Sequence, residues 1–406
     1  MILSLPYLVQ REELMMFDAS EIHVVPGLQL ERPYHSIAQA IDAYYSRYRE
    51  ISLDLFANPE LGRQEFYAVR TLAAELERLG FQVETGYCGM PTAFRADPPV
   101  INRGPKVALL PEYDALPEVG HACGHNLIAA SCLAAAVGVL AVAPELKGSF
   151  TLIGAPDEET AAGKAELLER GGYPDIDYAL SVHPGTENAT RRQYRAASSF
   201  LVIFNGKTAH AAATPERGIN ALDALVDFYQ AFRELRDAQP QAVSLNAVIR
   251  EGGLKTNIIP DRCVAEVNIR TPDQAGTDIV TARIHELAEQ AAARLGARVE
   301  YQPLQPKYRE MKTDIPLVET YEANLVRLGV GYDISLKERT GSTDVANLSH
   351  EFPTIHPWMR IVAEGNPENI SGHHRCFAEA SASEFGHRQM LLAAKAMAFT
   401  VYDLLK

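Results

Sequence analysis

Apolar and polar positions along the chain form two kinds of pattern: short apolar runs and longer stretches with helical periodicity. The runs at 105–111, 148–155 and 177–182 are typical of buried strands. A stretch of mostly Ala, Leu and Val from Leu127 to Ala143, with Asn126 at the expected N-cap and a proline after it, predicts a helix. Strands that alternate with helices in this way predict an α/β domain with a mainly parallel sheet.

Each predicted strand runs directly into polar residues at its C-terminal end. The first leads to Glu112, the second to Asp157, Glu158 and Glu159, and the third to His183. The carboxyl ends of parallel strands meet at one edge of a sheet, where ligands bind in open α/β folds. A single loop carboxylate is usually only solvated, but arrival on three consecutive strands predicts one shared site.

The loop between the first of these strands and its helix contains a thiol and two imidazoles, at His121, Cys123 and His125. Gly120 and Gly124 allow this loop to turn tightly. A single Cys or His is more often a packed core residue, but three together suit a borderline-soft metal such as zinc. A redox pair is excluded because Cys123 has no second cysteine at that spacing, and the following helix is short for a membrane span.

The pattern changes near Ala197, where the order β-α-β-β-α-β predicts a ferredoxin-like α+β unit. Its elements are expected at 198–204, 216–235, on both sides of a turn at 256–260, and at 277–295 and 298–302. The pattern of the larger domain then resumes. We therefore expect an inserted domain at 197–306 between the two parts of a larger domain, 34–196 and 307–406, with an N-terminal extension at 1–33.

The rest of the larger domain follows from the same patterns. Helices are expected at 35–49, 65–79, 317–328 and 384–404, strands at 81–84 and 353–362, and polar loops at 341–344 and 371–374.

Composition narrows the classes of partner. The 406 residues are 47% hydrophobic and 22% charged, which is ordinary for a globular enzyme, and their formal net charge is −14. This charge argues against nucleic acid and against an anionic membrane as partners. The five cysteines are scattered and odd in number, which predicts a reducing, cytoplasmic environment and no disulfide framework. We expect no signal peptide, because the N-terminus has no basic region.

Six short motifs occur along the chain in this order: G-H-A-C-G-H-N, P-D-E-E, S-V-H-P-G, G-K-T-A-H-A-A, T-N-I-I-P and H-H-R-C-F. Together they resemble the co-catalytic zinc amidohydrolases and exopeptidases of the aminoacylase and glutamate-carboxypeptidase type, over about residues 35–395. The motifs E-Y-D-A-L-P, C-G-H-N and G-S-T-D are most similar to the aminobenzoyl-glutamate hydrolase and β-alanyl-lysine dipeptidase branch. Other branches usually have Asp where Asn126 stands.

The resemblance implies an exopeptidase-type catalytic domain with two divalent metal ions, zinc or alternatively manganese or cobalt, and a lid and dimerisation domain inserted into it. A bridging thiolate would hold ions about 3.5–4 Å apart. Asp114 and Asp344 would orient the ligands. His373 is preferred to His374 because it lies four residues before Phe377. The implied ligands are Cys123 as the bridge, His125, Glu159, His183 and His373.

The resemblance also implies roles around the metal ions. Glu158 would be the general base that deprotonates a metal-held water and passes the proton to the leaving amine. His210 and Asn257 would be polarising groups from the inserted domain. Arg270, with Asn257 nearby, would bind a substrate carboxylate; the alternative for Arg270 is an ordinary salt bridge.

The expected activity is hydrolysis of an amide bond beside a free carboxylate, by a homodimer. The substrate would be a small molecule, either a dipeptide or an N-acyl or N-aminobenzoyl amino acid. Two other hypotheses account for these residues less well. A non-catalytic binding protein on the same fold is disfavoured because no implied ligand is missing. A cysteine-nucleophile hydrolase using Cys123 and His125 would leave Glu158, Glu159 and His183 without a role.

Overall fold

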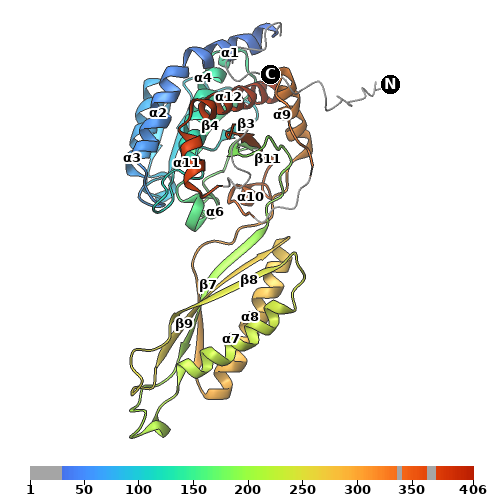
Figure 1. Cartoon of the computed structure of the whole chain (residues 1–406). Coiled ribbons are helices and arrows are strands. Elements are labelled where there is room, and N and C mark those ends of the chain that lie inside the picture. The colour runs from blue at the N-terminus through green and yellow to red at the C-terminus, as the bar shows by residue number, and fades with distance from the viewer. Residues whose placement is uncertain (1–29, 336–340, 364–371) are drawn as a thin grey trace, which may run out of the picture.

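Two large β-sheets, one in each part of the molecule, organise the fold (Figure 1), and two short strands form a third, small sheet. The computed structural model describes residues 30–335, 341–363 and 372–406, so most of the expected N-terminal extension lies outside the described residues. In the larger part, β4, β3, β5 and β11 are parallel, which confirms the mainly parallel sheet that the sequence predicts. The strand order is β1 (Gln82–Thr85), β2 (Phe94–Asp97), β4 (Ser149–Gly154), β3 (Lys106–Leu109), β5 (Tyr178–Leu180) and β11 (Thr354–Ile355).

Helices cover this sheet and enclose its core. α4 (His125–Leu140) lies against α1 (Arg32–Ala43), α2 (Tyr45–Ala57) and α12 (Glu384–Leu405), and nearly all of its residues are buried. A helix enclosed on every side needs no polar face, which explains its continuous Ala-Leu-Val pattern. None of the helices in the described ranges combines the length and apolarity that a membrane crossing requires. The other α-helices described in the larger part are α3 (Phe66–Arg78), α5 (Glu158–Ala161), α6 (Gly163–Glu169), α9 (Ile315–Arg327), α10 (Val345–Leu348) and α11 (Arg375–Ser381).

The second sheet, which we call the lid sheet, comes from one continuous segment. Its order is β10 (Arg298–Pro303), β7 (Ala196–Asn205), β9 (Arg262–Thr271) and β8 (Ser244–Glu251), with every pair antiparallel. α7 (Ala221–Asp237) and α8 (Gln274–Leu295) pack against it and share a separate hydrophobic core. This is the predicted ferredoxin-like unit. Figure 1 shows it projecting from the larger part, to which it is joined before β7 and after β10.

The start of α4 differs from the expectation. Its N-cap is Gly124, with a left-handed φ of 80°, and not Asn126. Asn126 lies within the first turn of the helix, where its side-chain amide donates to Ser52 Oγ at 3.0 Å and to the Ser381 carbonyl at 3.2 Å. The amide thus holds neighbouring segments together and does not cap the helix.

The single strand predicted at 353–362 is two strands in two different sheets. β11 ends at Ile355, and β12 (Trp358–Arg360) pairs in parallel with β6 (His183–Gly185) in a small separate sheet. Pro357 lies between β11 and β12 in the sequence, and a proline has no N–H to continue the hydrogen bonds of a strand. The chain therefore leaves the large sheet at His356, which places this residue at the carboxyl edge.

Other boundaries also move. The helix predicted at 35–49 is two helices, α1 and α2, that meet at Tyr44. α7 begins later than the predicted 216 because the Asn220 side chain accepts from Leu222 N and caps the helix there. β2 was not predicted.

Candidate metal centre

The loop after β3 brings Cys123 and His125 to the carboxyl edge of the large sheet. A Cβ atom at Gly124 would lie 2.8 Å from Pro184 Cγ, and the φ of this residue is 80°. Both facts require a glycine, because only glycine adopts this conformation freely and leaves room for β6. The turn therefore sets Cys123 before α4 and His125 in its first turn, next to β6.

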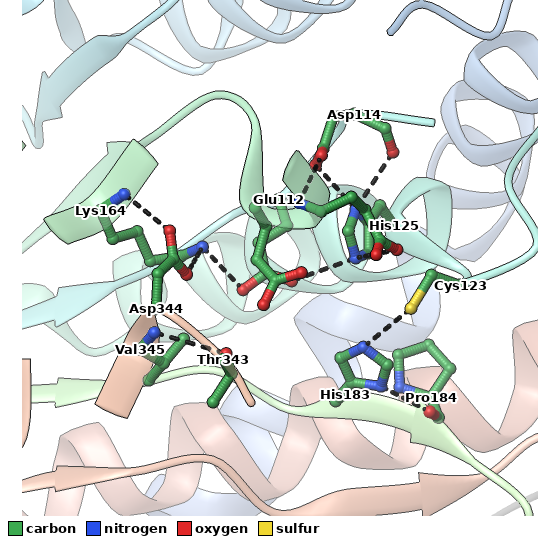
Figure 2. Close-up of polar contacts among 12 residues, drawn as sticks. Glu112, Asp114, Cys123, His125, Lys164, His183, Pro184, Thr343, Asp344 and Val345 are labelled. Carbon is green, nitrogen blue, oxygen red and sulfur yellow. Dashed lines mark hydrogen bonds and ion pairs between the residues drawn. The ribbon is translucent and has the colours of Figure 1, made fainter. Parts of the chain in front are cut away.

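Two overlapping groups of candidate ligand atoms share Cys123. The ligand atoms of Cys123, His125 and His183 lie within 4.8 Å of one another, and so do those of Cys123, Glu159 and His373. Figure 2 shows Cys123 Sγ directed toward His183, whose Nε2 is 3.4 Å away. The structure thus brings the five sequence-predicted ligands together around one thiol.

Hydrogen bonds determine which nitrogen of each buried histidine faces the centre. His125 Nδ1 lies 2.8 Å from Asp114 Oδ1, and His125 Nε2 is directed to Glu159 Oε1 at 3.7 Å. His183 Nδ1 donates to the Pro184 carbonyl at 2.6 Å, which leaves Nε2 for the centre. A ring N–H held in this way leaves the other nitrogen free to bind a metal. Asp114 thus contacts His125 directly, and it also accepts from Glu159 N at 3.1 Å.

Buried atoms without partners indicate that these residues fit metal ions. His125 Nε2 and Glu159 Oε1 are buried and have no hydrogen-bond partner among the described residues. An unpaired buried polar atom costs about 1–3 kcal/mol, so it usually has a partner outside the polypeptide. A thiolate, three imidazoles and a carboxylate are the donors that zinc and neighbouring divalent metals prefer.

The two adjacent histidines near the C-terminus have different contacts. His373 Nε2 lies 3.2 Å from Glu159 Oε2, whereas His374 Nδ1 accepts from Cys376 N and caps α11. The hydrogen bond to Glu159 raises the pKa of His373, although burial and, more weakly, the charges of His125 and Arg270 oppose this shift.

Glu158 lies beside the candidate ligands on a short, constrained helix. α5 is bracketed by Asp157 and Ala162, whose φ values of 61° and 52° are rare outside glycine. Arg63 Nε donates to the Asp157 carboxylate at 2.8 Å, and Asp157 N donates to Glu65 Oε1 at 2.8 Å. Burial, and then the charges of nearby carboxylates, raise the pKa of Glu158. A carboxylate with a raised pKa is a stronger base than an exposed one, which suits proton transfer.

A buried lysine that the sequence did not reveal lies behind Glu158. Lys164 Nζ lies 2.9 Å from Glu112 Oε1 and 2.8 Å from Asp344 Oδ1, and all three side chains are 0% exposed (Figure 2). Lys164 N also donates to Asp344 Oδ2 at 2.7 Å. Glu112 Oε2 in turn lies 3.5 Å from His125 Nε2. Asp344 therefore connects to the candidate ligands through Lys164 and Glu112. The three residues join the loop after β3 and the first turn of α6 to the turn before α10.

The predicted lid residues occupy opposite ends of the lid sheet. Asn257 and His210 lie close together at one end. The Asn257 carbonyl accepts from Ala211 N at 3.1 Å, and His210 forms an isolated antiparallel β-bridge with Ile258. Arg270 lies at the other end of β9, and ten residues of strand span about 30 Å. The expectation that Asn257 lies near Arg270 therefore does not hold within one chain. Figure 1 shows the loops that precede α7 and β9 at the end of the lid farthest from the larger part.

His356 is a second site residue that the sequence reasoning missed. Its ring centroid lies 5.5 Å from that of His183, it is 3% exposed, and neither ring nitrogen has a partner among the described residues. Burial lowers its pKa to about 3, so the ring is neutral. The signal was present in the sequence, because I-H-P at the end of β11 repeats the V-H-P at the end of β5.

Comparison with known proteins places these observations in a family context. The family described as a peptidase dimerisation domain matches residues 194–295, which contain most of the lid sheet. The Xaa-Arg dipeptidase of Mus musculus is 33% identical over 395 residues, covering 93% of this chain and 90% of that protein. A p-aminobenzoyl-glutamate hydrolase chain of Escherichia coli is 27% identical, and the match covers 92% of this chain and 92% of that one.

A solved structure has the same fold. The dinuclear metal binding peptidase from the M20 family of Bacillus subtilis matches with a TM-score of 0.64 and 22% identity, covering 90% of this chain and 100% of that one.

Replacement of Lys164 by Met should strongly destabilise the protein. Glu112 and Asp344 would remain buried without a cation, and removal of one partner of a buried ion pair typically costs about 3–5 kcal/mol. Urea unfolding followed by circular dichroism would measure the loss. Lys395→Met is the matched control, because Lys395 is also buried but its partner Asp42 is 46% exposed, so about 0–1 kcal/mol is expected. Equal losses in the two variants would contradict the importance of the buried cluster.

Proposed function

We propose that this chain, which belongs to the M20 family of metallopeptidases, hydrolyses an amide bond next to a free carboxylate. The substrate would be a dipeptide or an N-acyl or N-aminobenzoyl amino acid. The observation that carries this proposal is the pair of ligand groups sharing Cys123. The names of the relatives support the substrate class, since an Xaa-Arg dipeptide and p-aminobenzoyl-glutamate both end in an amino acid with a free carboxylate.

Two divalent ions at this centre, zinc or alternatively manganese or cobalt, would polarise the scissile carbonyl and acidify a water molecule. The residues that would hold these ions are Cys123, His125, Glu159, His183 and His373. Glu158 would accept the proton of the attacking water and return it to the leaving amine. Its buried position keeps this proton away from bulk solvent.

The lid would complete the site in a homodimer. His210 and Asn257 lie about 30 Å along the lid sheet from the end that meets their own larger part, so we propose that they act on the site of the partner. β8 is an edge strand of the lid sheet, and its Val248 and Ile249 are 52% and 45% exposed. An exposed apolar edge can pair with its own copy about a two-fold axis.

Arg270 would bind the carboxylate of the substrate from the near end of the same lid. Its backbone pairing with Ala197, which also pairs with Tyr308 next to Glu158, supports this position. A comparison of kcat/KM for carboxylate substrates and their amidated analogues tests the role, which fails if both are cleaved equally well. The domain boundaries at 197–306 and the cytoplasmic location remain predictions from the sequence.

The Cys123→Ser variant should lose metal and activity together. Wild-type protein is expected to hold two ions per chain after dialysis, and the variant fewer, because a serine hydroxyl is a poor replacement for a bridging thiolate. Elemental analysis gives the stoichiometry, and Cys88→Ser, on a different loop, is the control. Undiminished hydrolysis by the wild-type protein after exhaustive chelation would exclude a metal-dependent reaction.

The Glu158→Gln variant should keep its metal ions and lose most of its turnover. General acid–base catalysis contributes about 10²- to 10⁴-fold, so kcat should fall by that factor. Stopped assays with a panel of dipeptides and N-acyl amino acids measure this fall, and Glu169→Gln, at the exposed end of α6, should behave like the wild type. A normal kcat in Glu158→Gln would assign the base to another group.

Mixtures of two inactive variants should recover activity if His210 acts in trans. His210→Ala should lower kcat by about 10²- to 10³-fold, as expected for a lost oxyanion donor. When this variant is mixed in equal amounts with Glu158→Gln under subunit exchange, about half of the dimers are heterodimers, and each of these has one intact site of two. About a quarter of wild-type activity should therefore return. No recovery, with exchange confirmed by mass spectrometry, would place His210 at the site of its own chain.

A further inference from the structure

The segment that leads from the lid back into the larger part contacts α5, the short helix that begins at Glu158. The Tyr308 hydroxyl donates to the Glu158 carbonyl at 2.9 Å, and the tyrosine is 7% exposed. Burial raises the pKa of Tyr308, so the hydroxyl stays protonated and keeps its role as donor. The sequence shows no sign of this contact, because the two residues are 150 positions apart.

Tyr308 also lies where the segment that leaves the lid pairs with the start of β7. Its backbone pairs with Ala197, through Ala197 N to Tyr308 O at 3.0 Å and Tyr308 N to Ala197 O at 2.9 Å. Ala197 is paired on its other side with Arg270 in the β7–β9 ladder. One row of backbone partners therefore runs from Arg270 to Tyr308, and the Tyr308 hydroxyl extends it to Glu158.

A small buried cluster joins the paired residues Ala197 and Tyr308 to α5 and α6. Its members are Ala162, Ala165, Ala197 and Tyr308. Ala162 is the left-handed residue that ends α5, with φ of 52°. Such a conformation persists only where its surroundings impose it, so the packing around Ala162 helps to hold Glu158 in place.

A cleft lies beside this point, between the lid and the larger part. This cleft of about 960 Å³ lies between α6 and α10 on one side and α8 and β10 on the other. Asn347 holds the residues on both sides of Tyr308, because its Nδ2 donates to the Lys307 carbonyl at 2.8 Å and its Oδ1 accepts from Arg309 N at 3.1 Å. The backbone is thus fixed at Tyr308 while the lid beyond it borders open space, as expected for a hinge.

We propose that Tyr308 is a positioning residue that couples the orientation of the lid to the placement of Glu158. The inference rests on the proposed role of Glu158 as general base. A substrate carboxylate bound by Arg270 would set the lid angle, the Arg270–Ala197–Tyr308 row would transmit it, and the Tyr308 hydroxyl would hold the Glu158 backbone in its catalytic position. Lid closure and correct placement of the base would then occur together.

The Tyr308→Phe variant tests this coupling, since it removes one hydroxyl and preserves the ring. Tyr301→Phe is the matched control, because Tyr301 on β10 also donates to a backbone carbonyl, that of His285 at 3.0 Å, without contact to Glu158. Two measurements are needed: amide hydrogen exchange of residues 157–163, followed by mass spectrometry, and steady-state kinetics on a dipeptide. Thermal unfolding and metal content confirm that both variants fold.

We expect faster exchange at 157–163 and a kcat lowered by about tenfold or more in Tyr308→Phe, with KM little changed, because a misplaced group can cost about 10²-fold in rate. Tyr301→Phe should match the wild type in both measurements. Wild-type exchange in Tyr308→Phe would overturn the coupling, even if kcat falls. Faster exchange with an unchanged kcat would overturn the positioning role. If the wild-type protein hydrolyses no substrate, the proposed function fails, while hydrogen exchange still decides the coupling.

Discussion

The Lys164 ammonium, enclosed between Glu112 and Asp344, is the interaction on which the site depends most. Carboxylates accumulate at the carboxyl edge of the large sheet, and every additional buried negative charge raises the cost of the next. Although burial opposes ionisation, the charges of Lys164 and His125 lower the pKa of Glu112. A buried cation thus allows several loops that end in carboxylates to converge. Each ion pair of Lys164 also links two segments of the chain. The ion pairs with Glu112 and Asp344 therefore fix where these segments lie.

Metal ions would balance the negative charge among the candidate ligands, as the Lys164 ammonium does between Glu112 and Asp344. His125 Nε2 and Glu159 Oε1 face each other across 3.7 Å with no partner among the described residues, while the opposite atom of each group is held by hydrogen bonds. The chain has therefore fixed the orientation of its donors in advance. Binding then requires little rearrangement, and the free energy of a bound ion can stabilise the folded state.

The sequence was most informative where chemistry follows a strand. The convergence of His125, Glu159 and His183 follows from parallel strands that end in polar residues, a local signal that can be read without knowing the fold. Lys164 could not be found in this way, since a lysine early in a helix normally points to solvent. Its burial depends on Asp344, 180 residues later. The separation of Asn257 from Arg270 could have been read from the sequence, because the strand predicted after the turn at 256–260 lies between the two residues. Only the direction of this strand relative to the larger part required both sheets.

The division into two parts separates the requirements for folding from those for closure. The lid sheet has its own core of residues such as Phe204, Phe228 and Ile269, so it can move as a unit without exposing the core of the larger part. Its two connections pair side by side at Ala197 and Tyr308. The proposed change of lid angle would therefore act at a pair of residues that contacts Glu158, the proposed general base. A lid that only excluded water would need no such contact, which is why the attachment of Tyr308 to Glu158 is better explained by coordination than by shielding.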